Sequence, residues 1–237
     1  MHHGRLPLLS QNQRIAKVTQ ALSVTNLVVT SDRGRPILTV PQLDVAAGEA
    51  AVITGPSGAG KSTLLYSIAG LVTAAKGKIR WGETRLSELG DARRTAFRRE
   101  NIGFVFQDHM LFEELSALDN AALSAAYAPR HERASLRAGA ERVLDQLGLA
   151  ADGRGTHTYS GGERQRIAVA RALAGDPGII LADEPTASLD RETADRLTDD
   201  LLDLAARGRT LLIVSHDPVV QARIGRRIEV LDGALAA

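Results

Sequence analysis

A glycine-rich run is the strongest chemical signal in this sequence. Residues 55–62 read Gly-Pro-Ser-Gly-Ala-Gly-Lys-Ser, which is the pattern of a glycine, four residues and Gly-Lys-Ser/Thr. Such glycines let backbone N–H groups converge on phosphate oxygens, and a following helix adds the positive end of its dipole. Lys61 can bridge the β- and γ-phosphates of a nucleotide, and the Ser62 hydroxyl can hold Mg²⁺. A plain glycine turn is the alternative, but an apolar run precedes this loop and a helical pattern follows it, so we predict nucleotide binding. The candidate phosphate-binding residues are Gly55, Pro56, Ser57, Gly58, Ala59, Gly60, Lys61, Ser62 and Thr63.

A pair of acidic residues gives the second signal. Residues 179–182 read Ile-Ile-Leu-Ala and predict a buried strand, which Asp183 and Glu184 follow directly. Ligands of open α/β sheets lie outside the carboxyl ends of the strands, so this pair should face the phosphate site. Asp183 can hold Mg²⁺ through water, and Glu184 can polarise the water that attacks the γ-phosphate. Without the phosphate loop, the better interpretation of such a pair is a solvated loop.

Two further polar residues stand at the ends of predicted strands. Gln107 closes the strand predicted at Ile102–Phe106, and His216 follows the strand predicted at Leu211–Val214. The Gln107 amide oxygen could ligate Mg²⁺, and His216 could donate a hydrogen bond to the γ-phosphate. Both residue types are commonplace in loops, so only their strand-end positions favour these roles.

A serine and two glycines open another predicted helix. Ser160 is a good N-cap, Gly161 and Gly162 expose backbone N–H groups, and Glu163 suits the first turn of a helix. This is a second anion-binding helix start, which a single folded chain does not obviously need. A well-capped helix without any ligand is the alternative interpretation.

Apolar runs and helical patterns alternate along most of the chain. Strands are predicted at Leu22–Val29, Ile37–Val45, Ala50–Thr54, Ile79–Trp81, Ile102–Phe106, Ile179–Ala182, Leu211–Val214 and Ile228–Leu231, the last of them ending the sheet. Helices are predicted at Lys61–Ala69, Glu163–Ala174 and Arg191–Ala206. The alternation predicts an α/β fold with a largely parallel sheet that is covered on both faces. Residues 1–20 are expected to be a flexible tail before one domain at 21–237, in which residues 108–158 form an inserted helical subdomain.

The composition excludes several classes of protein. The chain has no cysteine, which rules out disulfides and thiolate metal sites, and its net charge of +1 gives no reason to expect nucleic acid as a ligand. The arginines between Arg93 and Arg99 are interpreted as a solvated face or a partner contact. No stretch reaches the roughly 20 apolar residues of a membrane span, and no secretory pattern opens the chain. The sequence therefore predicts a soluble, cytoplasmic protein.

Taken together, the motifs resemble those of the ABC ATPase family. Residues 159–166, Tyr-Ser-Gly-Gly-Glu-Arg-Gln-Arg, are similar to the family's signature, which is usually Leu-Ser-Gly-Gly-Gln. Residues 181–186, Leu-Ala-Asp-Glu-Pro-Thr, are similar to its Walker B motif and extension. The order of phosphate loop, Gln107, signature, acidic pair, 188–190 (Ser-Leu-Asp) and His216 is also the family's, and the resemblance covers residues 22–233. It implies a P-loop NTPase core with a mostly parallel sheet, an inserted α-helical subdomain and an antiparallel β portion near the N-terminus.

The resemblance also implies an ATP-hydrolysing subunit that uses ATP and Mg²⁺ and works as a homodimer. In that family the signature of one copy meets the phosphate loop of the other, and residues 188–190 would lie across the dimer seam. Gln107 would link the γ-phosphate to the helical subdomain, whose surface receives a transmembrane permease at the inner face of the cell membrane. The implied catalytic residues are Glu184 and His216, the implied metal ligands are Ser62, Gln107 and Asp183, and further nucleotide contacts are Gln107, Ser160, Gly161, Gly162, Glu163 and Asp190.

The chain departs from the family pattern at the place where the base should bind. Family members usually stack adenine on an aromatic residue near the end of the first strand, but residues 28–32 read Val-Val-Thr-Ser-Asp. Phosphate contacts should then carry most of the binding, unless Tyr159 or a residue of the tail supplies a substitute ring. Two runs, 99–107 and 115–122, look most like the subgroup that serves lipoprotein release, macrolide export and the cell-division complex.

Two other functions were weighed against a transport ATPase. A non-transport ABC ATPase could regulate a membrane or nucleic-acid complex, but DNA-repair relatives carry coiled coils or zinc-binding inserts and translation factors carry two cassettes. This chain has one cassette, no cysteine and no sustained heptads. A kinase or GTPase with a phosphate loop leaves residues 160–163 unexplained. The cargo is not encoded in this sequence.

Overall fold

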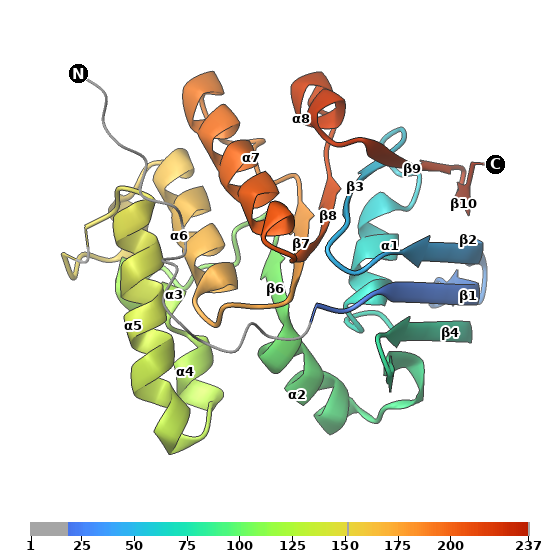
Figure 1. Cartoon of the computed structure of the whole chain (residues 1–237), viewed down its shortest axis with the longest axis horizontal. Coiled ribbons are helices and arrows are strands. Elements are labelled where there is room, and N and C mark those ends of the chain that lie inside the picture. Colours follow the sequence, from blue (N-terminus) through green and yellow to red (C-terminus); the bar gives the residue numbers. More distant parts are fainter. Residues whose placement is uncertain (1–18, 151, 237) are drawn as a thin grey trace.

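The computed structural model describes residues 19–150 and 152–236, whose arrangement is shown in Figure 1. Ten strands within these residues form one mixed sheet in the order β5-β4-β1-β2-β10-β9-β3-β8-β7-β6. They are β1 (Leu22–Thr30), β2 (Pro36–Val45), β3 (Ala50–Thr54), β4 (Lys76–Trp81), β5 (Thr84–Arg85), β6 (Ile102–Val105), β7 (Ile179–Asp183), β8 (Thr210–Val214), β9 (Arg226–Leu231) and β10 (Ala234–Leu235). The predicted α/β fold class is confirmed. The predicted tail lies, as far as residue 18, outside the described residues.

Helices cover this sheet and also form a layer of their own. They are α1 (Lys61–Ile68), α2 (Asp91–Asn101), α3 (Ala117–Ala121), α4 (Ser124–Tyr127), α5 (Arg130–Gln146), α6 (Gly161–Leu173), α7 (Arg191–Ala206) and α8 (Pro218–Arg223), with single 3₁₀ turns at η1 (Leu86–Glu88) and η2 (Thr156–Thr158). Within the described residues, no helix is both long enough and apolar enough to span a bilayer.

The strands β9, β3, β8, β7 and β6 form the parallel half of the sheet. Every residue of β7 and β8 is buried, because helices pack on both faces. Ile180 and Ala182 of β7 join a core with α5, α6 and α7, whereas Ile179 and Leu181 join a second core with α1 and the antiparallel strands. The carboxyl ends of β3, β8, β7 and β6 lie at one edge, so the loops that follow them are neighbours.

The antiparallel half is built on the hairpin of β1 and β2. Its turn is closed by a 2.8 Å hydrogen bond from the Ser31 N–H to the Arg35 carbonyl oxygen. A short last strand, β10, pairs with both β9 and β2 and so joins the two halves of the sheet. The prediction that the strand at Ile228–Leu231 ends the sheet is therefore wrong. Asp232 and Gly233, with φ of 46° and 77°, turn the chain back for a strand too short to show a pattern.

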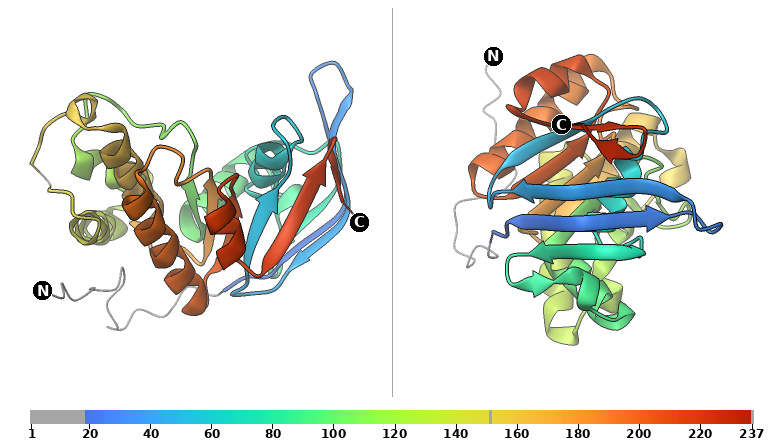
Figure 2. Two further views of the ribbon diagram at one scale, coloured as in Figure 1. Left: turned by 90° about the horizontal axis from the view of Figure 1, so that it is seen from above. Right: turned by 90° about the vertical axis from the view of Figure 1, so that its right-hand side faces the viewer.

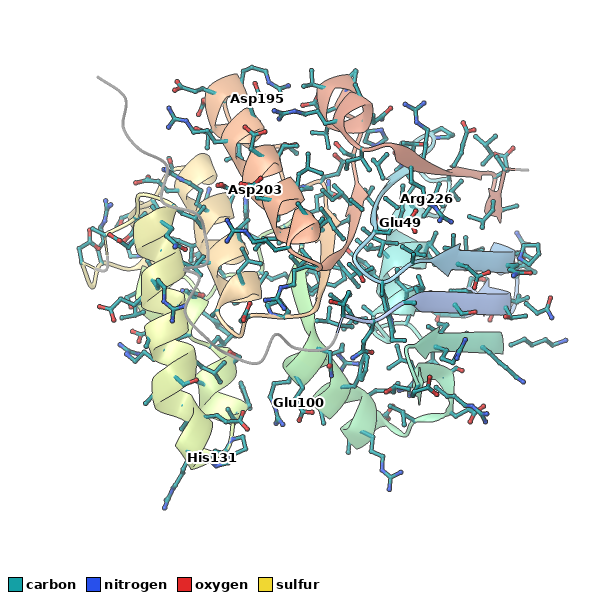
Figure 3. The ribbon with its side chains drawn as sticks, viewed as in Figure 1. Glu49, Glu100, His131, Asp195, Asp203 and Arg226 are labelled. Atoms are coloured by element: carbon teal, nitrogen blue, oxygen red, sulfur yellow. The ribbon has the colours of Figure 1, made fainter. Side chains whose placement is uncertain are left out.

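An arginine fastens the two halves together near the beginning of β3. Arg226 Nη1, from β9, donates to both carboxylate oxygens of Glu49, at 2.9 and 3.0 Å. The other terminal nitrogen, Nη2, donates to the carbonyl oxygen of Asp44 in β2. Figure 3 shows the Arg226 and Glu49 side chains close together beside β3 and β9.

The helices between β6 and β7, which are α3 to α6, form a layer on the far side of the parallel strands. In Figure 1 they lie at the left and the antiparallel strands at the right, and the view from above in Figure 2 shows the same order. The range predicted as an inserted subdomain, residues 108–158, contains α3, α4, α5 and η2. Because α3 and α5 both pack on α6, this later helix completes the layer although it lies outside the predicted range.

Candidate functional site

The phosphate loop joins β3 to α1 in the conformation that its glycines allow. Gly55, Gly58 and Gly60 have φ of 140°, 77° and 103°, which residues with a Cβ seldom adopt. A Cβ added at Gly55 would lie 2.0 Å from the carbonyl oxygen of Val230, so the backbone of β9 leaves room only for glycine there. The loop also rests on the last turn of the sheet, because the Gly233 N–H donates to the Ala59 carbonyl oxygen at 3.0 Å.

Lys61 is the first residue of α1 and is only 6% exposed. Its Nζ donates to the carbonyl oxygens of Gly55 and Pro56, at 3.0 and 2.8 Å. The ammonium group is thus held inside the curve of the loop by the loop's own carbonyls. A phosphate group in that curve would meet one full positive charge and the amino end of a helix.

Asp183 is the last residue of β7, which extends one residue beyond the predicted strand, and Glu184 follows it directly. Asp183 is 1% exposed, and neither of its carboxylate oxygens has a well-formed hydrogen bond within the described residues, although the Tyr66 hydroxyl is a neighbouring donor. A buried, unpaired carboxylate is costly unless a cation or a further donor satisfies it, so Asp183 fits a metal ligand. No group of three His, Asp or Glu side chains in residues 19–150 and 152–236 could hold a metal alone. Mg²⁺ usually takes one or two protein ligands and shares the phosphates of a nucleotide.

Glu184 lies one residue further, in the left-handed conformation with φ of 48°. Its backbone N–H donates to the Val214 carbonyl oxygen at 3.0 Å, which ties the acidic pair to the end of β8. The His216 N–H donates to Glu184 Oε2 at 3.3 Å, and His216 Nε2 lies 3.4 Å from Oε1. Burial raises the pKa of Glu184, although the His216 backbone hydrogen bond and ring charge lower it in part. The His216 side chain is 57% exposed and can therefore also reach a ligand.

Gln107 lies in the turn after β6 and is exposed. The strand itself ends at Val105, one residue earlier than predicted. Because Val105 pairs with Ala182 of β7, Gln107 lies at the same edge of the sheet as Asp183. The predicted strand-end residues are thus brought to one edge.

Tyr66 is a neighbour of this site that the sequence analysis missed. It lies one turn after the phosphate loop on α1, and its ring centroid is 5.6 Å from that of Phe104 and 6.3 Å from that of Phe106. Burial, together with the charge of Asp183, raises the pKa of the Tyr66 hydroxyl to about 12. Its position on α1, shortly after the phosphate loop, is the only feature of the sequence that could have indicated that Tyr66 lies near the site.

The second helix start carries a complete capping box. The Ser160 N–H donates to Glu163 Oε2 at 2.8 Å, and the Glu163 N–H donates to Ser160 Oγ at 3.2 Å. These hydrogen bonds lower the pKa of Glu163 and turn its carboxylate toward its own helix. A Cβ added at Gly162 would lie 3.4 Å from Leu189 Cδ2, so the start of α6 lies beside the loop before α7.

Two of the residues singled out by the sequence are engaged locally. Asp190 caps α7, where it accepts hydrogen bonds from the Thr193 N–H at 3.0 Å and from Thr193 Oγ1 at 2.7 Å. Tyr159 is 4% exposed, donates to Asp152 Oδ1 at 2.9 Å, and has the guanidinium carbon of Arg154 4.0 Å from its ring centroid. Its ring is therefore covered and is not available to stack on a base. The idea that Tyr159 replaces the missing aromatic is wrong.

Comparisons with known proteins agree with this arrangement. The family model described as "ABC transporter" matches residues 38–187. The chain is 43% identical over 196 residues to the lipoprotein-releasing system ATP-binding protein LolD of Bordetella avium, which covers 81% of this chain and 84% of that protein. It is 41% identical over 204 residues to the macrolide export ATP-binding/permease protein MacB 1/2 of Paracoccus denitrificans, which covers 85% of this chain but 30% of that protein. The chain thus spans about a third of its MacB relatives.

Solved structures give the same picture. The dimeric structure of MJ0796, a bacterial ABC transporter cassette, matches with a TM-score of 0.83 and 34% identity over 91% of this chain and 97% of that one. A dimeric post-hydrolysis state of MJ0796 bound to ADP and Pi matches with a TM-score of 0.81, 33% identity and the same coverage.

Proposed function

Because this chain belongs to the ABC transporter family, we propose that it is the ATP-hydrolysing subunit that powers a separate membrane permease. The observation that carries the proposal is the meeting of three groups at one edge of the sheet. These are the phosphate loop with its enclosed lysine, the buried and unpaired carboxylate of Asp183, and Glu184 beside it. The similarity to a cassette that was solved with ADP and Pi supports the same reaction here.

In this proposal the phosphate loop binds the nucleotide and Glu184 activates water. Lys61 exchanges its bonds to the loop carbonyls for bonds to the β- and γ-phosphates. Glu184 polarises the water that attacks the γ-phosphate, and burial raises its pKa, which makes its carboxylate a stronger base. His216 donates to the γ-phosphate through its ring while its backbone N–H holds the Glu184 carboxylate. The products are ADP and inorganic phosphate.

We also assign the Mg²⁺ of the nucleotide to Ser62, Asp183 and Gln107. The buried carboxylate of Asp183 and the partly buried Ser62 fit such a site, and Gln107 lies at the same edge. The ion supplies charge neutralisation at the phosphates.

Dimerisation would complete each site. The chain has two glycine-rich helix starts that suit anions, one at α1 and one at α6, and they belong to different layers of the fold. We assign Ser160, Gly161 and Gly162 of one copy to the ATP held by the phosphate loop of the other. Asp190, which is exposed at the start of α7, would lie at the seam. The dimeric MJ0796 structures support this assembly.

The permease partner is assigned to the helical layer. Three exposed large apolar side chains, Met110, Phe112 and Tyr127, come from residues 108–158, and they are 57%, 52% and 76% exposed. Exposed apolar side chains of this kind often mark a protein contact. The similarity to LolD and MacB favours a permease of a lipoprotein-releasing or macrolide-exporting kind, on whose cytoplasmic side this chain would sit.

The decisive experiment measures ATP-dependent dimerisation. The Glu184→Gln chain should bind ATP without turning it over, so light scattering with ATP and Mg²⁺ should show about twice the monomer mass. Ser160→Arg on the same background should remain monomeric, because its long cation would occupy the signature's place at the partner's phosphates. Ser124→Arg, at the start of α4, is the control, because it adds the same side chain away from the signature. Ser57→Arg is unsuitable, since Ser57 lies in the phosphate loop itself. An unchanged mass with ATP, with the permease also present, would count against the shared site.

A further inference from the structure

Arg171, in the last turn of α6, binds the loop that carries Gln107. Its Nη2 donates to the carbonyl oxygen of His109 at 2.6 Å, and its Nη1 donates to the carbonyl oxygen of Met110. Burial lowers the pKa of Arg171, so the guanidinium has given up much of its hydration for these contacts. We refer to this pair of hydrogen bonds as the Arg171 clasp.

The clasp holds two residues in an unusual backbone conformation. His109 and Met110 have φ of 56° and 51°, in the left-handed region that residues with a Cβ seldom adopt. Such residues persist only where the surrounding structure over-determines them. Here the carbonyl oxygen of each residue is bound by the same guanidinium, whose planar fork presents several donors in a fixed geometry.

The strand before the loop rests on the same turn of α6. A Cβ added at Gly103 of β6 would lie 2.4 Å from the Ala172 carbonyl oxygen and 2.7 Å from Pro177 Cγ. The segment from β6 to Met110 therefore contacts the end of α6 at two places, before and after Gln107. A shift of α6 along its axis would move this segment with it.

We propose that Arg171 is a positioning residue that fixes the loop 107–110 on α6 and thereby presents Gln107 to the γ-phosphate. The proposal rests on the function assigned above. Ser160 caps the N-terminal end of the same helix, α6, and would contact the ATP bound by the partner copy.

The first test observes the loop directly and needs no nucleotide. In the full chain, Arg171→Met should speed amide hydrogen exchange at residues 107–111 by about tenfold or more, because local opening then costs less. Arg98→Met is the matched control. Arg98 Nη1 also donates to a backbone carbonyl, that of Gly70 at 2.8 Å, and burial also lowers its pKa, but it lies on α2. Its exchange at 107–111 should equal that of the parent.

The second test separates positioning from general damage. Arg171→Met should lower kcat for ATP about tenfold while the affinity for ATP stays within about threefold, because only the γ-phosphate contact is misplaced. Arg171→Lys keeps the charge but not the fork, so its kcat should be intermediate. A merely structural role would lower kcat and affinity together.

Three results would overturn the proposal. The first is unchanged exchange at 107–111 in Arg171→Met, the second is faster exchange with unchanged kcat, and the third is a loss of kcat and affinity together. If Arg171→Met does not fold, Arg171→Lys decides the question by the same two measurements. A parent chain that hydrolyses no ATP, with or without its permease, would refute the proposed function. The exchange experiment would still show whether the clasp holds the loop.

Discussion

Replacing Glu184 by Gln is expected to stabilise the nucleotide-free protein while it abolishes turnover. The Glu184 side chain is 13% exposed, and its carboxylate lies beside the buried carboxylate of Asp183. Burial and the charge of Asp183 raise the pKa of Glu184, while contacts with His216 offset only part of this effect. A glutamine keeps the shape and the acceptor for the His216 N–H, but it carries no charge.

The pH dependence has a definite sign. A carboxyl group whose pKa is raised by folding binds more protons in the folded state than in the unfolded state, so its ionisation costs stability as pH rises. For Glu184 this cost is absent below its ordinary value of 4.5, grows as pH rises through the raised pKa, and is constant above it. Replacing this buried carboxylate by a neutral amide is expected to add about 0.5–2 kcal/mol to the free energy of unfolding, as a typical stabilising substitution does. For a chain of this length that corresponds to an increase in Tm of about 1–8 °C.

The assay is calorimetry from pH 4 to 8 without nucleotide, together with phosphate release at neutral pH. Glu192→Gln is the matched control, because Glu192 is exposed and its carboxylate forms an ion pair with Arg196 on the same helix. Its effect on the free energy of unfolding should stay below about 0.5 kcal/mol. A Glu184→Gln protein with a lower Tm at neutral pH, or a difference in Tm that does not vary with pH, would refute the argument from burial. Turnover within about threefold of the parent would show that Glu184 is not the catalytic residue.

Two further predictions concern the base and the phosphate loop. The hairpin turn at Ser31 offers no aromatic ring, and ring–base stacking is worth roughly 1–3 kcal/mol, so GTP should be hydrolysed within about tenfold of the rate for ATP. Ser31→Tyr should lower KM for ATP, and a strong ATP preference that Ser31→Tyr leaves unchanged would contradict this. Gly55→Ala should lower Tm and prevent ATP binding, because its Cβ would meet the Val230 carbonyl at 2.0 Å. Gly58→Ala, where nothing lies within 4 Å, should cost only the strain of its φ, and equal losses in the two variants would refute the steric argument.

The rule that ligands bind outside the carboxyl ends of parallel strands accounts for most of what could be predicted from the sequence. Asp183, Glu184, Gln107 and His216 were each placed after an apolar run, and parallel pairing brings those ends to one edge. The pattern of apolar residues was sufficient because β7 and β8 are buried throughout. The missed strand β10 has two residues, which is too few for any periodicity to be visible.

Contacts between distant segments could not be predicted in this way. Arg171 and His109 are 62 positions apart, and an arginine in a helix gives no indication of which carbonyl it will reach. The local contact of Glu163, by contrast, could be predicted, because its spacing of three residues from Ser160 is the pattern of a capping box. That pattern was available in the sequence and gives the Glu163 carboxylate a local partner. Its assignment as a nucleotide contact stays a prediction.

The hydrogen bond from the Gly233 N–H to the Ala59 carbonyl oxygen makes the turn between β9 and β10 a mechanical support of the phosphate loop. Gly233 also accepts a 2.6 Å hydrogen bond from the Thr39 N–H through its carbonyl oxygen, so three segments meet at this turn. A force applied to β10, by a fused domain or by a bound partner, would therefore be transmitted to the backbone that encloses Lys61. Conversely, occupancy of the loop would restrain β10. The turn at Asp232 and Gly233 is consequently a sensitive place for a spectroscopic reporter of nucleotide exchange.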